Sequence, residues 1–372
     1  VIIVGGGVAG CATALSLAKS NTTASFLLVD DAEPSTFKIG ESLPAEASRW
    51  LQYLCPTLPN ELAQDTIKGI HHHCAGNASV WQSPELHETF AMMNPFGSGW
   101  HLDRAVFDEC LRKQVRARCS SQENQRNSFL KGKFVNVRKD ENGWAVTLKR
   151  SESNAYVELH CSWLVDASGR KASLGAKTIK LDRLLAFYAL MGATNVDLDH
   201  RTLIEATENG WWYSSQLSDN KRVVVFHTDD QDPSSKRARK PEGFLDMLQQ
   251  TTHISQTIEN VDYRIISSAG YPRCTAAGSS YLEPFGDEGD QWCAVGDAAV
   301  AFDPLSSQGM ITSLRMGGSL GIVLAKKINH SDASSLHLVR DQYDECRRDY
   351  EKKRGYFYQQ SMFSSGFWAR QR

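Results

Sequence analysis

Two glycine-containing segments, far apart in the chain, carry residue types that could bind a phosphorylated ligand. The first, GGGVAG at residues 5–10, has G-x-G-x-x-G spacing and follows the apolar run VIIV at residues 1–4. In such a motif Gly5 permits a tight turn, Gly7 lets the backbone approach a pyrophosphate, and Gly10 lets the next helix pack close to the strand. The phosphates would lie at the N-terminus of the helix predicted for VAGCATALSLAK.

An acidic residue follows this motif at the distance expected for a ribose contact. The strand predicted for ASFLLVDD contains Asp30, twenty residues after Gly10, with Asp31 beside it. A carboxylate in that place can accept hydrogen bonds from ribose hydroxyls. Strand, glycines, helix, strand and acid, in that order, predict a dinucleotide site. At this point both NAD and FAD fit as its ligand.

The second segment, GDAAVAFDPLSSQGM at residues 296–310, favours FAD. It is typical of a strand end, a Gly296-Asp297 turn, a loop and then a helix. Asp297 could hydrogen-bond the hydroxyls of a ribityl chain. Backbone N–H groups between Pro304 and Met310 could face a ring that carries negative charge when reduced. Because NAD has no ribityl chain, two distant sites of this kind fit FAD better.

The elements around these turns predict an α/β fold. A third buried strand, in SWLVDASGR, ends at Asp166 and Gly169. In an open α/β sheet, ligands lie beyond the carboxyl ends of the strands, so the three turns should meet at one edge. The segment GKFVNVRKDENGWAVTLKR predicts a β-hairpin with an Asn-Gly turn, and a helix should begin at Asp103 or a neighbour.

These elements suggest a discontinuous domain organisation. We expect a Rossmann-like FAD-binding domain built from residues 1–50, 100–180 and 265–330, and a sheet-rich substrate domain from residues 51–99 and 181–264. Residues 331–372 are expected to form a C-terminal helical segment that covers the site or faces a partner.

Composition excludes several classes of protein. The 372 residues carry a formal net charge of −2, which gives no reason to expect nucleic-acid binding. No apolar run approaches the ~18 residues of a membrane span, and no secretory signal is visible. The nine cysteines are scattered and contain no C-x-x-C, which favours reduced thiols and a cytoplasmic location. The basic run SSKRARK at residues 234–240 is expected to be a solvated loop.

The order of these motifs resembles that of the aromatic-hydroxylase-fold flavoproteins, the group that contains p-hydroxybenzoate hydroxylase. More narrowly, KIGESLP, GWHLDR, DASGR, GDAAVAFDPLSSQGM and SGFWARQR resemble the flavin-dependent halogenase branch. The resemblance implies FAD contacts at Gly5, Gly7, Gly10, Asp30, Glu41, Ser42, Arg104, Asp297, Pro304, Gly309 and Met310. The predicted cofactor-binding set also includes Val8, Ala9, Asp31, Val135, Asp166, Gly169 and Gly296.

Two departures from the halogenase pattern argue against halogenation. Tryptophan halogenases carry a W-x-W-x-I-P segment, where this chain has WWYSS at residues 211–215. They also use a lysine after the glutamate-containing loop, and GIHHHCAGNASVW at residues 69–81 has none. The remaining resemblance is to the flavoproteins that mature quinoproteins with a tryptophylquinone, of the glycine oxidase and lysine ε-oxidase type. In that group the flavoprotein acts on a tryptophan of a partner polypeptide.

No side chain stands out as a catalytic acid or base. His72, Trp212 and Pro304 are candidate pocket residues, and core packing is the alternative for the tryptophan. A metal site at residues 71–73 is not expected, because consecutive side chains point in different directions. An indole substrate tolerates the absence of a base, since unlike a phenol it needs no deprotonation.

We therefore expect an FAD-dependent monooxygenase that hydroxylates a tryptophan in a quinoprotein oxidase precursor. The alternatives are a halogenase or hydroxylase of a small aromatic, and a non-catalytic FAD-binding chaperone. Gly317, Gly318 and Gly321 are expected to permit close helix packing and not to form a second dinucleotide motif. Without a second Rossmann unit, reduced nicotinamide would bind transiently, or a separate reductase would supply the electrons.

Overall fold

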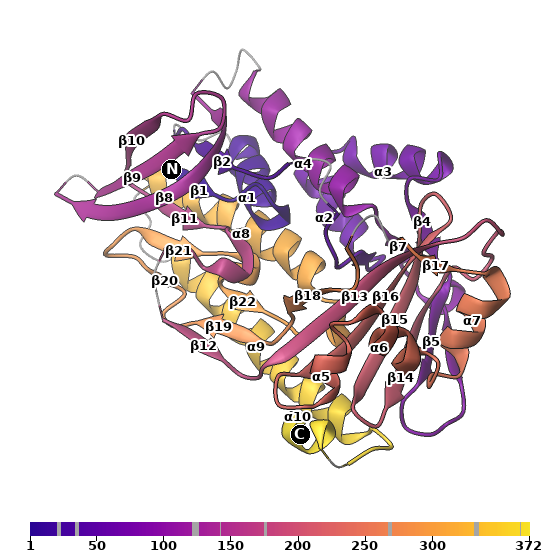
Figure 1. The fold of residues 1–372 in the computed structure, drawn as a ribbon. Coiled ribbons are helices and arrows are strands. Elements are labelled where there is room, and N and C mark those ends of the chain that lie inside the picture. The colour runs from indigo at the N-terminus through magenta and orange to yellow at the C-terminus, as the bar shows by residue number, and fades with distance from the viewer. Residues whose placement is uncertain are drawn as a thin grey trace.

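The computed structural model describes residues 1–372 except 21–23, 34–36, 121–125, 142, 175–176, 267–269, 331–334 and 365. Its elements form two large sheets, each with its own hydrophobic core (Figure 1). The long helix α9 (Ser335–Gln359) contributes side chains to both cores.

The first sheet contains the predicted nucleotide-binding unit. In order across the sheet its strands are β10 (Tyr156–Cys161), β9 (Gly143–Arg150), β8 (Ser128–Asp140), β2 (Leu27–Asp30), β1 (Ile2–Val4), β11 (Leu164–Asp166), β21 (Trp292–Ala294) and β20 (Gly286–Asp287). The five strands from β8 to β21 run parallel. The strand β1 is apolar throughout because both of its faces are covered: Ile3 faces the helices, and Ile2 and Val4 belong to a cluster with β9.

Helices cover one face of this sheet, and the β8–β9–β10 hairpins cover the other. The helices are α1 (Val8–Lys19), α2 (Ala47–Leu54), α3 (Leu58–Ile67), α4 (Arg104–Cys119) and α8 (Gly309–His330). Helix α4 begins where expected, because the Asp103 side chain accepts hydrogen bonds from the N–H groups of Ala105 (2.9 Å) and Val106 (3.1 Å). The expected pairing is confirmed, with β8 and β9 antiparallel from the pair Gly132–Arg150 to the pair Asp140–Gly143. Residue 142 of the expected Asn-Gly turn lies outside the described residues.

Small residues let α1 and α8 pack closely, as expected for the glycines of α8. A Cβ added at Gly317 would lie 2.5 Å from the carbonyl oxygen of Ala9, and one at Gly321 would lie 2.6 Å from Cβ of Ser16. Both distances are too short for carbon atoms. The two helices that carry the two glycine-containing segments are therefore held in direct backbone contact.

The second sheet is largely antiparallel. Its order is β17 (Arg264–Ile265), β13 (Leu184–Gly192), β16 (Lys221–Asp229), β15 (Gly210–Leu217), β14 (Arg201–Thr207), β5 (Gly76–Val80) and β6 (His87–Phe90), and β18 (Arg273–Ala276) also pairs with β13. Helices α6 (Pro241–Leu248) and α7 (His253–Val261) supply side chains to its core. The other face of β13, β15 and β16 turns toward the first sheet.

Shorter elements connect the two sheets. They are β3 (Ser42–Leu43), β7 (Gly99–His101) and β4 (His72–Cys74) in one small sheet, and β12 (Thr178–Lys180), β19 (Ser280–Leu282) and β22 (Val300–Ala301) in another. Single turns occur at Ala91–Met93, Gly169–Lys171, Gly296–Ala298 and Pro304–Ser306. The C-terminal helix α10 (Phe367–Gln371) packs against the second sheet, where the Trp368 indole N–H donates to the Thr207 carbonyl (2.9 Å).

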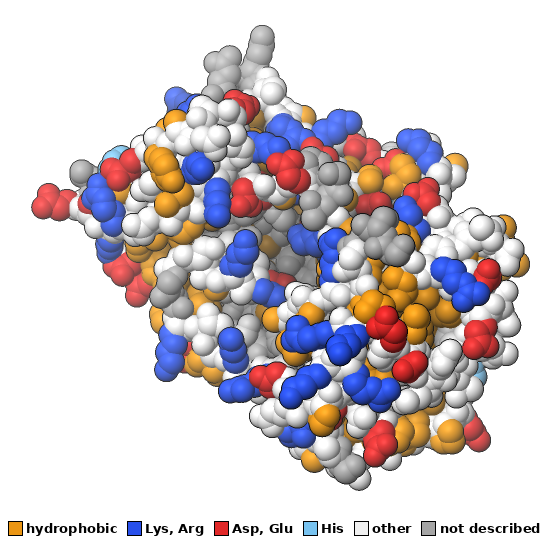
Figure 2. Space-filling view, viewed as in Figure 1, with side chains coloured by type: hydrophobic (Ala, Val, Ile, Leu, Met, Phe, Trp, Pro, Cys, Tyr) orange, Lys and Arg blue, Asp and Glu red, His pale blue; other side chains and the backbone are white. Residues whose placement is uncertain are grey.

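The basic run at residues 234–240 differs from its expected loop conformation. It begins with the short helix α5 (Ser234–Arg237), and the Asp232 carboxylate, two residues before it, accepts the Ser234 N–H (3.0 Å). Figure 2 shows Lys and Arg side chains gathered over this part of the molecule. In the described part of the chain, no helix is long and apolar enough to cross a membrane.

Candidate functional site

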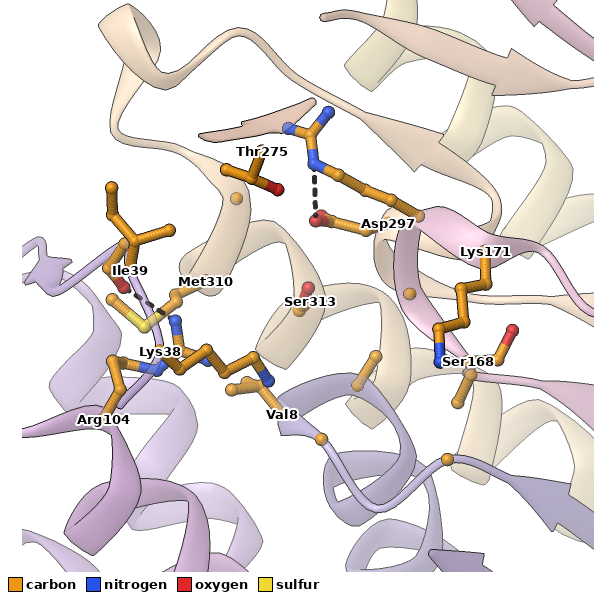
Figure 3. A pocket seen from close by; sticks show the side chains of 18 of the residues that line it. Val8, Lys38, Ile39, Arg104, Ser168, Lys171, Thr275, Asp297, Met310 and Ser313 are labelled. Atoms are coloured by element: carbon orange, nitrogen blue, oxygen red, sulfur yellow. Dashed lines mark hydrogen bonds and ion pairs between the residues drawn. The ribbon is translucent and has the colours of Figure 1, made fainter. Parts of the chain in front are cut away.

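A cavity of about 780 Å³ lies between the two sheets (Figure 3). Its size falls in the range of roughly 300–1,000 Å³ that is typical of small-molecule sites. Fourteen predicted cofactor residues line it, from all three expected turns: Gly5, Gly7, Val8, Ala9, Asp30, Asp31, Glu41, Ser42, Arg104, Gly169, Asp297, Pro304, Gly309 and Met310. The tertiary structure thus brings together segments that are almost 300 residues apart.

Four predicted cofactor residues do not line the cavity: Gly10, Asp166 and Gly296 lie in the turns behind its wall, and Val135 lies on the surface. A Cβ at Gly10 would lie 1.9 Å from the Gly5 carbonyl oxygen, and one at Gly296 would lie 2.6 Å from Cβ of Ala9. Asp166 holds its own turn by accepting the N–H of Ser168 (2.9 Å). Val135 is exposed on β8, and the three residues before it line the cavity.

The space beside Gly7 fits a phosphate group. A Cβ at Gly7 would meet only the ammonium nitrogen of Lys38, at 4.0 Å, so the backbone faces open space beside a cation. Lys38 and Arg104 both contact Asp108, with Lys38 Nζ 3.0 Å and Arg104 Nε 3.1 Å from its carboxylate. Burial alone would raise the pKa of Asp108, but these two cations outweigh it and lower the pKa. The result is a cationic rim at the N-terminus of α1.

The carboxylate of Asp30 is held at the end of β2 by two contacts. The Gly6 N–H donates to Oδ1 (3.1 Å), and Arg112 Nη1 lies 3.4 Å from Oδ2. Burial raises the pKa of Asp30, and the Gly6 N–H and Arg112 counter that rise. The acid is therefore oriented by the glycine turn itself, at the place where a ribose contact was expected.

The segment before β3 joins the first sheet to the second across the cavity. The Ser215 hydroxyl donates to Glu41 Oε1 (3.0 Å), while the Gly40 N–H donates to Oε2 (2.9 Å). The hydroxyls of Ser42 and Tyr213 share a hydrogen bond of 2.8 Å. Burial, followed by the charge of Glu41, raises the pKa of Tyr213 well above its ordinary value, so Tyr213 stays a neutral hydrogen-bonding group.

Asp297 projects into the cavity from the turn after β21 (Figure 3). Its carboxylate lies 3.6 Å from Arg170 Nε. The same guanidinium donates to the carbonyl of Phe302 (2.6 Å) and to that of Gly278. Arg170 therefore ties together the turn after β11, the Asp297 turn and the loop that leads to α8. This role was not predicted, although the quoted motif DASGR contains the residue.

Asp303 anchors that loop to helix α9. Its Oδ1 accepts the Leu305 N–H (2.9 Å), and its Oδ2 accepts the hydroxyl of Tyr358 (2.6 Å). Arg354 Nε lies 3.9 Å from the same carboxylate. Burial raises the pKa of Asp303 to about 6, against the opposing effect of these hydrogen bonds. The loop that carries Pro304 is thus positioned from the C-terminal helical segment.

The second sheet forms an uncharged wall of the cavity. Its lining residues are Ala186, Tyr213, Val225, His227, Thr275, Ala276 and Ala277. The imidazole of His227 stacks on the indole of Trp211, with ring centroids 3.7 Å apart. Burial lowers the pKa of His227 to about 3, so the ring is neutral at physiological pH.

Of the three candidate pocket residues, only Pro304 lines the cavity. Trp212 is fully buried on the opposite face of β15, against Phe226 and Phe244. His72 stacks on His200 in the small sheet beside β14 (5.5 Å). Within the described residues, no three His, Cys, Asp or Glu side chains gather as a metal site requires.

Sequence reasoning missed Tyr213, His227 and Asp303 at this site. The alternating pattern of β15 and β16 could have placed Tyr213 and His227 on one face of the second sheet. The pattern could not have predicted that this face turns toward the first sheet. The sequence feature that could have indicated Asp303 as a site residue was its position directly before Pro304. Its partner Tyr358 lies 55 residues later, and no local pattern joins the two.

No protein-family model matches the chain. Among proteins of known name, it is 28% identical over 314 residues to LodB of Marinomonas mediterranea, whose name describes an FAD-dependent oxidoreductase; the match covers 83% of this chain and 80% of LodB. The solved structure of CmlS, a flavin-dependent halogenase, superposes with a TM-score of 0.83 at 20% identity, over all of this chain and 67% of CmlS.

A third similarity is to a solved protein of another activity. QhpG, a peptidyl tryptophan dihydroxylase essential for tryptophylquinone cofactor biogenesis, superposes with a TM-score of 0.72 at 17% identity, over all of this chain and 77% of QhpG. At these identities the superpositions establish the fold. The chain has the α/β fold shared by flavin-dependent halogenases and this tryptophan hydroxylase, and the predicted fold class is confirmed.

Proposed function

We propose that the chain is an FAD-dependent monooxygenase that hydroxylates a tryptophan side chain of a partner polypeptide, a quinoprotein oxidase precursor, during the formation of a cysteine tryptophylquinone. LodB and CmlS are both flavin-dependent by name, and the cavity fits FAD, which supports the cofactor and the enzyme class. The fold shared with QhpG and the chemistry of the cavity support the tryptophan substrate.

The cavity residues fit FAD at separate points. Gly7 and the cations Lys38 and Arg104 would hold the pyrophosphate, and Asp30 would bind the adenosine ribose. Asp297 would accept hydrogen bonds from the ribityl hydroxyls. The flavin ring would then lie between residues 304–310 and the uncharged wall of the second sheet.

The observation that carries the substrate assignment is this uncharged wall. Every lining residue that β13, β15, β16 and β18 contribute is apolar or neutral, His227 included. A small aromatic acid would need a cation there, and a phenol would need a base. An indole ring needs neither, so the wall suits a tryptophan side chain whose position is set by contacts made elsewhere on the polypeptide.

When bound, FAD supplies the two-electron chemistry that activates molecular oxygen. In each hydroxylation one atom of O₂ is formally inserted into a C–H bond of the indole ring to give a hydroxyl group, and the other leaves as water. Two electrons and two protons come from an external reductant or reductase. The side chains of this protein have other tasks: Glu41 and Ser42 hold the two sheets together across the cavity, and the apolar wall keeps water from the reacting groups.

Halogenation is the main alternative, and the similarity to CmlS supports it equally. Against it stands the segment at residues 69–81, which contains no lysine. That segment forms β4 and β5, and its histidine His71 accepts the Asp103 N–H on Nδ1 (3.0 Å). The segment therefore offers no ammonium group to hold a hypohalous acid, and none of its residues lines the cavity.

The decisive experiment expresses the oxidase precursor with and without this protein, under heavy-isotope oxygen gas, and weighs the tryptophan-bearing peptide. We expect a mass increase from incorporated heavy oxygen only when this protein is present. Maturation in its absence would contradict both the monooxygenase and the chaperone alternative. Maturation that depends on this protein but incorporates no heavy oxygen would exclude the monooxygenase and favour the chaperone. A parallel reaction with bromide, free tryptophan and reduced flavin tests the halogenase alternative, for which efficient bromination is the signature.

A further inference from the structure

The uncharged wall of the flavin cavity contains three polar side chains, Tyr213, His227 and Thr275. The hydroxyl of Tyr213 already shares a hydrogen bond with Ser42 (2.8 Å). His227 is only 3% exposed, whereas Tyr213 and Thr275 are both partly exposed. His227 is therefore the most deeply buried polar side chain that the second sheet presents to the cavity, and the FAD contacts proposed above do not use it.

The imidazole of His227 has one nitrogen to offer to a ligand. Its Nδ1 is buried and has no hydrogen-bond partner of regular geometry among the residues that the structure describes. The backbone of Trp211, beside the ring, acts as an acceptor and partly opposes the fall in the pKa of His227 that burial causes. We assign the ring hydrogen to the buried Nδ1 for this reason, which leaves Nε2 as a hydrogen-bond acceptor on the part of the ring that lines the cavity.

A chain of buried contacts fixes this ring. The indole of Trp211 stacks on it, with ring centroids 3.7 Å apart and planes 11° from parallel. The Trp211 N–H donates to the hydroxyl of Tyr358 (3.1 Å), and that hydroxyl donates to Asp303 (2.6 Å). One hydroxyl group on α9 therefore holds both the support of His227 and the loop that carries Pro304, so the acceptor has a defined position relative to the segment expected beside the flavin ring.

A single buried acceptor in an apolar wall matches the chemistry of an indole. The indole N–H is a donor only, and the rest of the ring system is apolar. The wall around His227 is apolar as well, with Ala186, Val225 and Ala277 in its lining. Because burial lowers the pKa of His227 to about 3, the imidazole accepts a hydrogen bond at physiological pH but is a weak base. It therefore suits an indole, which keeps its proton, better than a phenol, which must lose one.

We infer that His227 is the residue that recognises the substrate indole: the ring lies in the flavin cavity against the uncharged wall, and its N–H donates to His227 Nε2. This inference rests on the proposed function and names the side chain that orients the substrate. His227 takes up no proton in this role. By holding the N–H edge of the indole, it determines which ring carbons face the flavin side of the cavity.

A pair of labelled peptides that differ at one atom position tests this inference. Both carry the sequence of the precursor around its tryptophan; in the second, 3-benzothienylalanine replaces tryptophan, so that sulfur stands in place of the N–H. The FAD-loaded wild type should bind the tryptophan peptide about fivefold to fiftyfold more tightly, because the analogue leaves a buried acceptor without a donor. His227→Phe should bind the two peptides equally, since phenylalanine keeps a ring beside Trp211 and has no acceptor.

Two further variants accompany this comparison. His87→Phe makes the same change at an exposed position of β6, outside the cavity lining, and should keep the wild-type preference for the tryptophan peptide. His227→Gln replaces the ring by an amide whose oxygen is also an acceptor, and it should recover part of the preference that His227→Phe loses. Thermal unfolding and FAD titration of each variant check the fold and the cofactor site.

Several results would overturn the inference. The first is equal affinity of the wild type for the two peptides, or binding of neither, and this result does not depend on whether any variant folds. The others are a wild-type preference in His227→Phe and loss of the preference in Thr275→Val, which would assign the N–H to Thr275. If His227→Phe hydroxylates the precursor with the KM and kcat of the wild type, the inference fails and the proposed function stands. If the wild type adds no oxygen to the precursor, the proposed function fails whatever the peptides do.

Discussion

Among single residues, Asp297 tests the FAD site most directly. It projects into the cavity after β21, and about a third of its side chain is exposed. Asp297→Ala should remove hydrogen bonds to the ribityl chain and weaken FAD binding by about 1–2 kcal/mol, roughly fivefold to thirtyfold. Titration of the apoprotein with FAD, followed by flavin fluorescence, measures the change.

The control for this prediction is Asp246→Ala on α6, an exposed acid remote from the cavity lining. Its affinity for FAD should equal that of the wild type. Unchanged affinity in Asp297→Ala would show that the late Gly-Asp turn does not contact the cofactor, and would remove the main reason for choosing FAD over NAD.

We expect Asp303 to make the stability of the folded protein depend on pH, and comparison with a variant isolates the contribution of this residue. Burial raises its pKa from 3.8 to about 6 in the folded protein. The protonated form therefore favours folding; this contribution is fully present below about pH 4 and is lost as pH rises through about 6. Asp303→Asn carries no charge, so the melting temperature of the variant relative to the wild type should rise between these two pH values and then stay constant.

The prediction compares the melting temperature of the variant with that of the wild type, because other groups also change their protonation in this pH range. The pKa values of His101 and His227 are lowered by burial to about 3, which acts on stability in the opposite direction, but both proteins contain these histidines. Asp246→Asn, at an exposed position of α6, serves as the control substitution. If the difference in melting temperature between Asp303→Asn and the wild type does not change with pH, then burial does not destabilise the ionised Asp303 carboxylate in the folded protein.

At the scale of elements, the contact between α1 and α8 decides where the two glycine-containing segments lie. A Cβ at Gly321 would lie 2.6 Å from Cβ of Ser16 and 2.7 Å from the Thr13 carbonyl oxygen. Gly321→Ala should therefore force the helices apart and lower the free energy of unfolding by about 1–3 kcal/mol, less a gain in helix propensity of up to ~1 kcal/mol.

Gly355→Ala on α9 is the matched change, because a Cβ at that position meets nothing within 4 Å. It should stabilise the protein by up to ~1 kcal/mol, since alanine is the better helix former. Urea unfolding of both variants gives the two values. Effects of the same sign would contradict the close packing on which the relative placement of Gly7 and Met310 depends.

For the whole molecule, the structure predicts that FAD links two sheets with separate cores. The dinucleotide motif belongs to the first sheet, yet Tyr213, Val225 and His227 of the second sheet line the same cavity. Saturating FAD, at about a hundred times its dissociation constant, should stabilise the folded protein by roughly 2.7 kcal/mol. Hydrogen exchange should slow in β15 and β16 as well as around residues 5–10.

Helix α7 is an internal control for that experiment, because it packs on the second sheet and contributes nothing to the cavity lining. We expect its exchange to change least. Protection confined to the first sheet would place the flavin ring away from the uncharged wall, and the substrate assignment built on that wall would lose its support.

Features that depend on local order along the chain could be predicted from the residues alone. The apolar strand, the glycine spacing and the acid of β2 predicted a dinucleotide unit, because a strand, a tight turn and a helix follow one another directly along the chain. The alternating segments around residue 142 predicted the β8–β9 hairpin for the same reason. Predicted residues of the three strand-end turns line one cavity, because strands in a parallel sheet end at one edge. Glu41, Ser42 and Arg104 line the same cavity, and they were predicted from the family resemblance.

Tertiary structure alone decided which side chains face that cavity. Trp212 and Tyr213 are neighbours on β15, and alternation puts them on opposite faces, but only the packing of the second sheet against the first turns Tyr213 inward. The hydrogen bond between Tyr358 and Asp303 likewise depends on α9, a helix near the end of the chain. Such contacts join segments that are far apart in the chain, and the local pattern of one segment does not predict its contact with the other. The contact depends on how the whole molecule packs.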